Sequence, residues 1–242
     1  MTYCIGMSLD EGLVFVSDSR TNAGIDKIAR FEKMRVFEKA GERVLVALSA
    51  GNLSVTQNAL NLLEMRAREN PEAPSVWNVS SMFEAARLLG DAMREVREYD
   101  EKYLREQNID VSASFILGGQ IAGENPRLFL VYSEGNFIEA LNDTPFFQIG
   151  EIKYGKPILD RMIQRQSTLE AGVKCALISF DATIRSNLSV GAPIDLLIYR
   201  ADSLRVDTRV RLMDDDPYLT RINREWDEGL HRVFDGLPGH DW

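Results

Sequence analysis

The order of strand-like and helix-like segments is the feature that most constrains how this chain folds. Short apolar runs come in pairs joined by turn residues such as Asp10-Glu11-Gly12 and Ala40-Gly41-Glu42, as in β-hairpins. Between them lie longer segments, also mostly paired, whose apolar residues recur at helical spacing. The pattern predicts strands at 3–9, 13–17, 33–38, 43–50, 111–121, 127–133, 137–141, 146–150, 194–200 and 205–212, and helices at 53–70, 81–107, 155–166, 168–185 and 217–234.

Hairpin strands run antiparallel, so the sheets are expected to be largely antiparallel. Each helix pair can cover one face of a sheet, and each sheet must also bury its other face. The compact arrangement is an α+β fold, a four-layer αββα sandwich with two mostly antiparallel sheets between helix pairs. No linker-like segment interrupts the chain. We therefore expect a single domain over 1–242, with a loop at 18–32 and a C-terminal tail at about 235–242.

The charge balance argues against nucleic acid and membranes as partners. The chain has 28 Lys and Arg against 37 Asp and Glu, a formal net charge of −9, whereas phosphates and anionic lipids select basic patches. No apolar run approaches the roughly 18 residues that a membrane helix needs. Two cysteines, Cys4 and Cys175, and two histidines, His231 and His240, are too few for a disulfide framework or a His-rich metal site. We expect a cytoplasmic protein with no metal and no other cofactor.

Thr2 is the first residue along the chain that can carry chemistry. Removal of the initiator methionine, which is efficient before a small residue, gives Thr2 a free α-amine beside its hydroxyl. A threonine hydroxyl is a weak nucleophile that needs a base, and an α-amine with a reference pKa of about 7.7–8.0 can act as one. Many chains begin Met-Thr without such a role, so Thr2 alone supports only a hypothesis.

Two charged residues stand at the ends of the predicted loop at 18–32. Asp18 follows the strand at 13–17, and Lys33 begins the strand at 33–38. Singly, such an aspartate is usually a turn or cap residue, and such a lysine is usually a solvated charge. In two adjacent hairpins, however, the chain N-terminus, Asp18 and Lys33 can meet at one sheet edge. A buried ammonium held there by a carboxylate lowers the pKa of a nearby hydroxyl and of a nearby amine.

A glycine lies where the strand at 43–50 passes into the helix at 53–70, in the segment Ser49-Ala50-Gly51-Asn52. Backbone N–H groups point outward at a helix N-terminus, where the helix dipole favours negative charge. The Gly51 amide is therefore a candidate donor for an oxyanion hole. The alternative is an ordinary strand-to-helix turn that needs glycine.

These residues, in this order and spacing, resemble the proteasome β-subunit superfamily of N-terminal-nucleophile hydrolases, whose fold is the same four-layer sandwich. The resemblance is carried by Thr2, by Gly12-Leu-Val-Phe-Val-Ser-Asp18-Ser-Arg20, by Lys33 and by Ser49-Ala-Gly51. It is most specific for the bacterial ancestral β-subunit family, Anbu, and spans nearly the whole chain. The stretches that match this family are 17–24, 27–34, 48–55 and 185–191.

The resemblance implies a role for each candidate residue. Thr2 is the implied nucleophile, and Asp18 and Lys33 complete the core of the site. Gly51 supplies the oxyanion amide.

The resemblance also points to a supporting region. Proteasome β-subunits usually place a serine in a Gly-Ser-Gly segment near the nucleophile, where this chain has Gly150-Glu151-Ile152. Their supporting aspartate and serine fall near Asn187 and Ser189. No aspartate is evident there, and Asn187 or Ser186 is the candidate for a partial substitute.

We therefore predict an N-terminal threonine peptidase that cleaves peptides or unfolded proteins within a homo-oligomer. The resemblance implies an open or spiral ring, and it leaves any ATPase partner unidentified. Two alternatives stay open: an amide hydrolase or transferase acting on a small peptide-like metabolite, and a weakly active or inactive assembly subunit. The second is motivated by the missing aspartate and by the lack of a propeptide beyond Met1.

Overall fold

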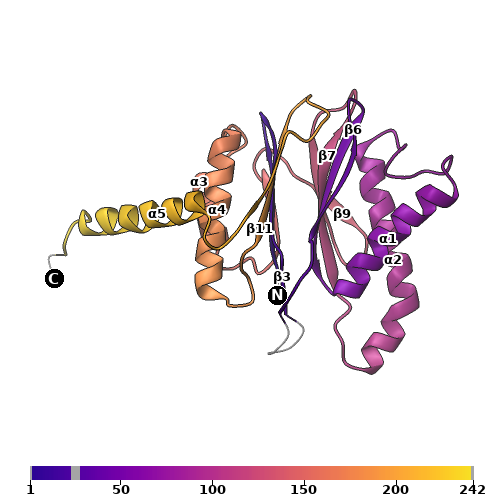
Figure 1. Cartoon of the computed structure of the whole chain (residues 1–242), viewed down its shortest axis with the longest axis horizontal. Helices are drawn as coiled ribbons and strands as arrows, with labels where there is room; N and C mark the ends of the chain where they lie inside the picture. The colour runs from indigo at the N-terminus through magenta and orange to yellow at the C-terminus, as the bar shows by residue number, and fades with distance from the viewer. Residues whose placement is uncertain (1, 23–27, 241–242) are drawn as a thin grey trace.

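Two five-stranded antiparallel sheets face each other in the computed structural model, which describes residues 2–22 and 28–240 (Figure 1). The first sheet has the order β10-β1-β2-β11-β12, and the second has the order β5-β6-β7-β8-β9. Helices cover the outer face of each sheet, so the predicted four-layer α+β sandwich is confirmed. The strands of the first sheet are β1 (Tyr3–Leu9), β2 (Gly12–Asp18), β10 (Phe146–Gly150), β11 (Ile194–Arg200) and β12 (Thr208–Leu212).

The second sheet is formed by residues from the middle of the sequence. Its strands are β5 (Met34–Lys39), β6 (Arg43–Gly51), β7 (Ala113–Ile121), β8 (Arg127–Val131) and β9 (Phe137–Glu139). The helices are α1 (Leu53–Glu69) and α2 (Met82–Glu106) on this sheet, α3 (Lys156–Met162) and α4 (Leu169–Ser186) on the first, and α5 (Pro217–Asp235) near the C-terminus.

Three apolar clusters hold the four layers together. Because successive residues of a strand point to opposite faces, Tyr3 and Ile5 of β1 pack against α4 while Cys4 packs between the sheets. In β6, Leu45 packs under α1 and α2 while Val46 faces the first sheet. The strands are thus apolar on both faces, as a strand buried between two layers must be.

The helix starts follow from local capping. Asn52 caps α1, since its side chain accepts the amides of Ser54 and Val55. Ser81 caps α2 by accepting the Glu84 amide. The Asn52 cap places the end of β6 directly before α1, at the edge of the sandwich where β1 begins.

The predicted loop at 18–32 is not wholly irregular. β2 extends to Asp18, and β3 (Arg20–Asn22) pairs antiparallel with β4 (Ile28–Arg30). Two three-residue strands carry too few residues to show a period in the sequence, which is why a loop was expected. Residues 23–27 lie outside the described residues, as do Met1 and the last two residues of the predicted tail.

Several elements are shorter than expected, and α3 and β12 differ most. The helix predicted at 155–166 ends at Met162, because Ile163 is extended and Arg165 turns back to bind Ser8 and Asp10 at the β1–β2 turn. The strand predicted at 205–212 starts only at Thr208, after a turn with two left-handed residues, Asp202 and Leu204. Both shortenings result from contacts distant in sequence or from turn geometry.

The C-terminal helix α5 leaves the sandwich. It starts beside α4 and projects outward on the side opposite α1 and α2 (Figure 1). Leu219, in its first turn, is its fully buried residue. None of the helices that the structure describes combines the length and the apolar character that crossing a bilayer requires.

Candidate active site

A buried ion pair joins the end of β2 to the residue before β5. Lys33 Nζ lies 2.8 Å from Asp18 Oδ1, and the two side chains are 5% and 0% exposed. Lys33 Nζ also donates to the backbone carbonyl of Arg20 at 2.6 Å. Since an ammonium has three N–H donors, one of them has no partner among the described residues. It can serve a polar group placed beside the pair.

Thr2, immediately before β1, is held at this ion pair through its backbone. The Tyr3 amide donates to Asp18 Oδ1 at 2.9 Å, the same oxygen that binds Lys33. On its other side, the Thr2 carbonyl accepts the Glu151 amide at 2.7 Å. Thr2 is half-buried. Its backbone is thus fixed from two sides, at the sheet edge where Asp18 and Lys33 meet.

Gly150, the last residue of β10, sets how closely the chain can approach Thr2. Its φ is +86°, and a Cβ atom there would lie 1.9 Å from the Thr2 carbonyl oxygen. An L side chain rarely adopts this conformation and has no space in this position. Glycine is therefore required for the Glu151 amide to reach Thr2.

The electrostatics of Asp18 are those of a desolvated carboxylate with one cation. Burial raises the pKa of Asp18, while the Lys33 ammonium and the Tyr3 amide act in the opposite direction. Its second oxygen, Oδ2, is buried and has no hydrogen-bond partner in the part of the chain that the structure describes. Asp18 thus concentrates its interactions on one oxygen, which positions Lys33.

Gly51 ends β6 with a φ of +101°, and a Cβ atom there would lie 2.3 Å from the Ser112 carbonyl oxygen. The Ser49 amide donates to the Lys33 carbonyl at 3.0 Å, on the β5 side of β6. Because amides two residues apart in a strand point to the same side, the Gly51 amide also faces the side of Lys33. Asn52 then caps α1, so the helix N-terminus follows at once.

The supporting region is only partly assembled. The Asn187 amide donates from Nδ2 to Glu151 Oε2 at 3.0 Å, and Asn187 Oδ1 accepts the Ser189 amide. Ser186, the last residue of α4, is exposed. Within residues 2–22 and 28–240, neither the Ser186 nor the Ser189 hydroxyl has a hydrogen-bond partner. Among the described residues, Asn187 therefore hydrogen-bonds to the segment that binds Thr2, and the two serine hydroxyl groups do not.

Glu151 is the residue of this region that sequence reasoning did not select. It is buried, and it contacts Thr2 through its amide and Asn187 through its carboxylate. The signal in the sequence was the Gly150-Glu151 step at the end of a predicted strand. An acidic side chain there is ordinarily read as a solvated turn residue, and only the fold shows that it is enclosed.

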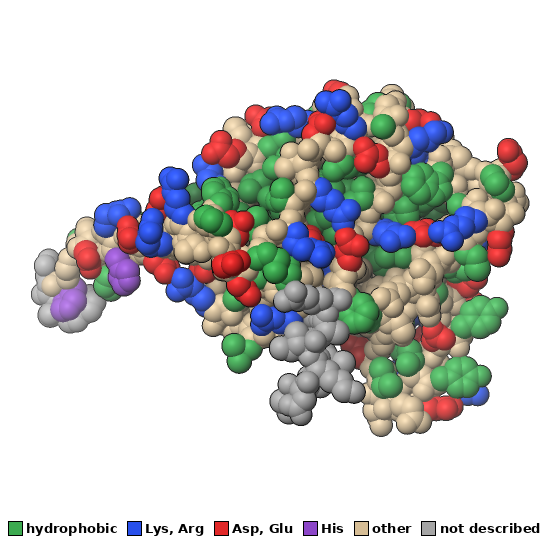
Figure 2. Space-filling view, viewed as in Figure 1, with side chains coloured by type: hydrophobic (Ala, Val, Ile, Leu, Met, Phe, Trp, Pro, Cys, Tyr) green, Lys and Arg blue, Asp and Glu red, His purple; other side chains and the backbone are tan. Residues whose placement is uncertain are grey.

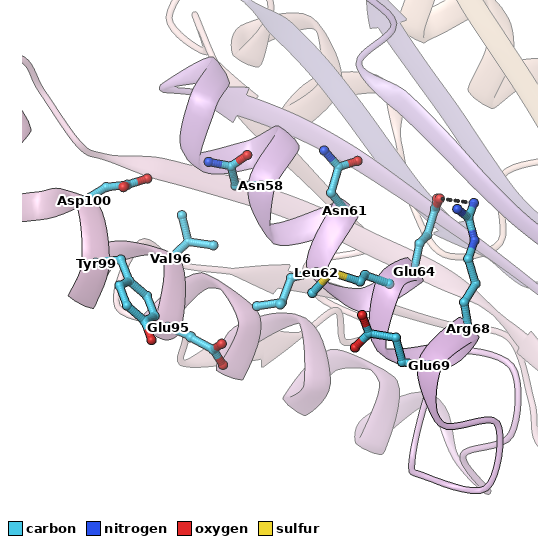
Figure 3. A pocket seen from close by; sticks show the side chains of 11 residues that line it. Asn58, Asn61, Leu62, Glu64, Arg68, Glu69, Glu95, Val96, Tyr99 and Asp100 are labelled. Carbon is cyan, nitrogen blue, oxygen red and sulfur yellow. Dashed lines mark ion pairs between the residues drawn. The ribbon is translucent and has the colours of Figure 1, made fainter.

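A groove lies elsewhere on the molecule. It has a volume of about 690 Å³ and lies between α1 and α2, with Leu62 and Val96 among its apolar residues and Glu69 and Asp100 among its acidic ones (Figure 3). None of the candidate residues lines it. The groove is separate from the site around Thr2.

The whole chain is similar to solved structures of Anbu proteins. The Anbu ancestral β-subunit of Yersinia bercovieri superposes with a TM-score of 0.92 at 50% identity, and the match covers 99% of each chain. Anbu from Hyphomicrobium sp. strain MC1 gives a TM-score of 0.90 at 45% identity, over 99% of this chain and 100% of that one. A chain from the helical assembly of the Anbu complex of Pseudomonas aeruginosa gives 0.93 at 50% identity, over 99% and 98%. No protein-family model and no curated protein matches the chain.

Identity at this level over full lengths goes beyond likeness of fold. It agrees with the family indicated by the four sequence stretches at 17–24, 27–34, 48–55 and 185–191. The chain therefore belongs to the Anbu family of ancestral β-subunits.

Proposed function

We propose that this chain is an N-terminal threonine peptidase of the proteasome type, with Thr2 as nucleophile once Met1 is removed. The observation that carries the proposal is the shared oxygen of Asp18. It binds both the Lys33 ammonium and the amide that follows Thr2. A buried ammonium near Thr2, with one N–H that has no partner among the described residues, is suited to activate a weak hydroxyl nucleophile.

In the proposed reaction, Thr2 Oγ attacks a peptide carbonyl carbon while the Thr2 α-amine takes the hydroxyl proton. Lys33 lowers the pKa of that hydroxyl, and Asp18 holds Lys33 in position. The carbonyl oxygen becomes an oxyanion that accepts a hydrogen bond from the Gly51 amide. The amine then passes its proton to the leaving amine, the C–N bond breaks, and water hydrolyses the resulting ester.

We further propose that the chain works as a homo-oligomer, and α5 supports this. Leu219 and Ile222 on one face of α5 pack on the chain's own core. The same face continues outward as Leu230, Val233, Phe234 and Leu237, which are 49% to 72% exposed. The side of the projecting helix seen in Figure 2 carries mostly acidic and basic side chains.

An exposed apolar stripe of this kind marks an interaction surface, and a helix that leaves its domain gains little stability by itself. A second copy of the chain is the proposed occupant. The helical assembly reported for the Pseudomonas aeruginosa Anbu complex supports a partner of the same kind. The proposed substrates are peptides or unfolded proteins. The proposed compartment is the cytoplasm, since Cys4 and Cys175 are both free thiols buried in the core.

The first test is the intact mass of the natively expressed protein before and after treatment with a covalent inhibitor directed at N-terminal threonine. Loss of Met1 and one adduct mapped to Thr2 are expected. Thr2→Ala should form no adduct, whereas Thr144→Ala, at an exposed threonine in a distant loop, should react like the unmodified sequence. Retained Met1 without an adduct would contradict the peptidase proposal.

A second candidate function, a weakly active or inactive assembly subunit, is favoured by the neutral Asn187 at the supporting position and by the exposed stripe on α5. Failure of the first test would place this function first. A reactive Thr2 that cleaves short amides but no unfolded protein would instead favour a hydrolase or transferase acting on a small peptide-like metabolite.

A further inference from the structure

Glu151 is a buried carboxylate with no ion-pair partner among the residues that the structure describes. It is 9% exposed, and the one donor to its carboxylate within the described residues is the Asn187 amide, at 3.0 Å from Oε2. A buried ionised carboxylate is costly unless a positive charge lies close by. A cation close to the Glu151 carboxylate would offset this cost.

The backbone places Glu151 directly against Thr2. The Glu151 amide donates to the Thr2 carbonyl at 2.7 Å, and the left-handed Gly150 before it makes this approach possible. Lys33 forms its ion pair with Asp18 and also donates to the Arg20 carbonyl. Removal of Met1 creates a further positive charge next to this contact, the α-ammonium of Thr2.

Asn187 holds the carboxylate in place. Its amide donates to the Thr183 carbonyl, its carbonyl accepts the Val190 amide, and its Oδ1 accepts the Ser189 amide. These bonds direct Nδ2 of Asn187 to Glu151. Because the Asn187 side chain is neutral, the negative charge of this pair resides on Glu151 alone.

We propose that Glu151 is the positioning residue and counter-ion of the Thr2 α-amine. This inference rests on the proposed function above and concerns the same site. When the amine takes the proton from Thr2 Oγ–H, the new ammonium is stabilised by the Glu151 carboxylate. In this role Glu151 orients and stabilises the ammonium, as the aspartate of a Ser-His-Asp triad does beside its imidazolium.

The consequence is a defined dependence on pH. Among the described residues, Asp18 from β2, Lys33 before β5 and Glu151 after β10 are the charged groups linked to Thr2, and Asn187 and Ser189 after α4 are neutral. The Arg20 guanidinium of β3 lies against the same loop and donates to the Leu188 carbonyl. An opposite charge within hydrogen-bond reach moves a pKa by about one unit or more. Removing the charge of Glu151 should therefore lower the pKa of the Thr2 α-amine.

Glu151→Gln is the test variant, because glutamine keeps the amide that binds Thr2 and an oxygen for Asn187. The pKa of the Thr2 α-amine is measured on the Met1-free full chain by competitive labelling with acetic anhydride across pH, with quantification of the N-terminal peptide. A fall of about one unit or more is expected. Glu151→Gln/Asn187→Asp, which returns one carboxylate to the pair, should restore the value. Glu170→Gln, at an 80% exposed carboxylate on α4, should leave it unchanged.

The same variants are then assayed for the rate of Thr2 modification by the threonine-directed inhibitor. Glu151→Gln should move the acid limb of the rate to lower pH and reduce the plateau rate by up to about tenfold, since the amine becomes a weaker base. A lower rate with an unchanged amine pKa would overturn the inference and leave Glu151 a structural role. If Glu151→Gln lowered the pKa of the Thr2 α-amine but the inhibitor did not modify Thr2 even in the unmodified chain, the inference would stand. The proposed peptidase function would then be wrong.

Discussion

Lys33 Nζ lies 2.8 Å from Asp18 Oδ1, although the chain segments that carry the two residues lead into different sheets. Asp18 ends β2 of the first sheet, and Lys33 directly precedes β5 of the second. The pair bridges the sheets at the edge where Thr2 lies, and both side chains are closed off from solvent. Because two buried charges are tolerable only together, folding and the charge of the candidate site depend on the same contact.

Lys33→Met should remove both reactivity and stability. It leaves Asp18 buried without a cation, which typically costs about 3–5 kcal/mol of unfolding free energy. Urea denaturation at neutral pH measures this loss, and intact mass measures the inhibitor adduct at Thr2. Asp18→Asn/Lys33→Met should regain most of the stability without regaining the adduct. If the double variant were as unstable as the single one, the ion pair would not be the cause.

The raised pKa of Asp18 predicts how stability varies with pH. Burial makes its carboxyl protonate at a higher pH in the folded chain than the ordinary value of about 3.9. Folding thus favours the protonated form, so this contribution to stability is complete below about pH 3.9 and is lost as pH rises through the raised pKa.

The check is urea denaturation of the unmodified chain and of Asp18→Asn across this range of pH. The stability of the unmodified chain relative to Asp18→Asn should fall as pH rises, by at most about 1.4 kcal/mol per pH unit. A relative stability that rises with pH would mean that Lys33 outweighs burial and that the pKa of Asp18 is lowered.

Gly150→Ala should displace Thr2. The added Cβ meets the Thr2 carbonyl oxygen at 1.9 Å, and displacing a reacting group by about 1 Å can slow a reaction about a hundredfold. The rate of inhibitor adduct formation is the measurement. Gly41→Ala is the matched control, since Gly41 has a similar φ of +77° but nothing within 4 Å of an added Cβ. Equal slowing in both variants would indicate general backbone strain.

Val233→Asp/Phe234→Asp should lower the oligomer mass in solution. These side chains are 67% and 72% exposed on the apolar stripe of α5, and a carboxylate buried there without a partner is costly. Size-exclusion chromatography with light scattering gives the mass. Glu228→Lys, on the charged face of the same helix and 58% exposed, should leave the mass unchanged. If Val233→Asp/Phe234→Asp kept the oligomer mass of the unmodified chain, α5 would not be part of the proposed interface.

Local patterns were sufficient to predict most of the fold. The apolar run at 3–9 and the turn at 10–12 predict a strand in a hairpin, and the paired strands and paired helices predict the sandwich. The caps at Asn52 and Ser81 can be predicted from local sequence, because a cap residue and the amides that it binds are neighbours in sequence. The short strands β3 and β4 were missed because their pairing depends on each other and not on a period.

Most residues of the candidate site could be predicted from the sequence, but their contacts and burial could not. Thr2, Asp18, Lys33 and Gly51 were selected from their order and spacing, together with a family resemblance. Glu151 was not, because its burial depends on Asn187, which lies 36 residues away and docks only when α4 packs on the first sheet. Ser186 and Ser189 were selected, yet their hydroxyl groups have no partner among the described residues.

The sequence by itself determined the elements, their order and the residues that can carry chemistry, because periodicity, caps and turns act over a few residues. Only the tertiary structure decided which charges are buried together: Lys33 with Asp18, and Glu151 with Asn187 beside Thr2. It also decided that the apolar face of α5 leaves the domain instead of closing on it. Burial is a property of the packed layers, and the desolvation that gives these charges their effect exists only once the layers have formed.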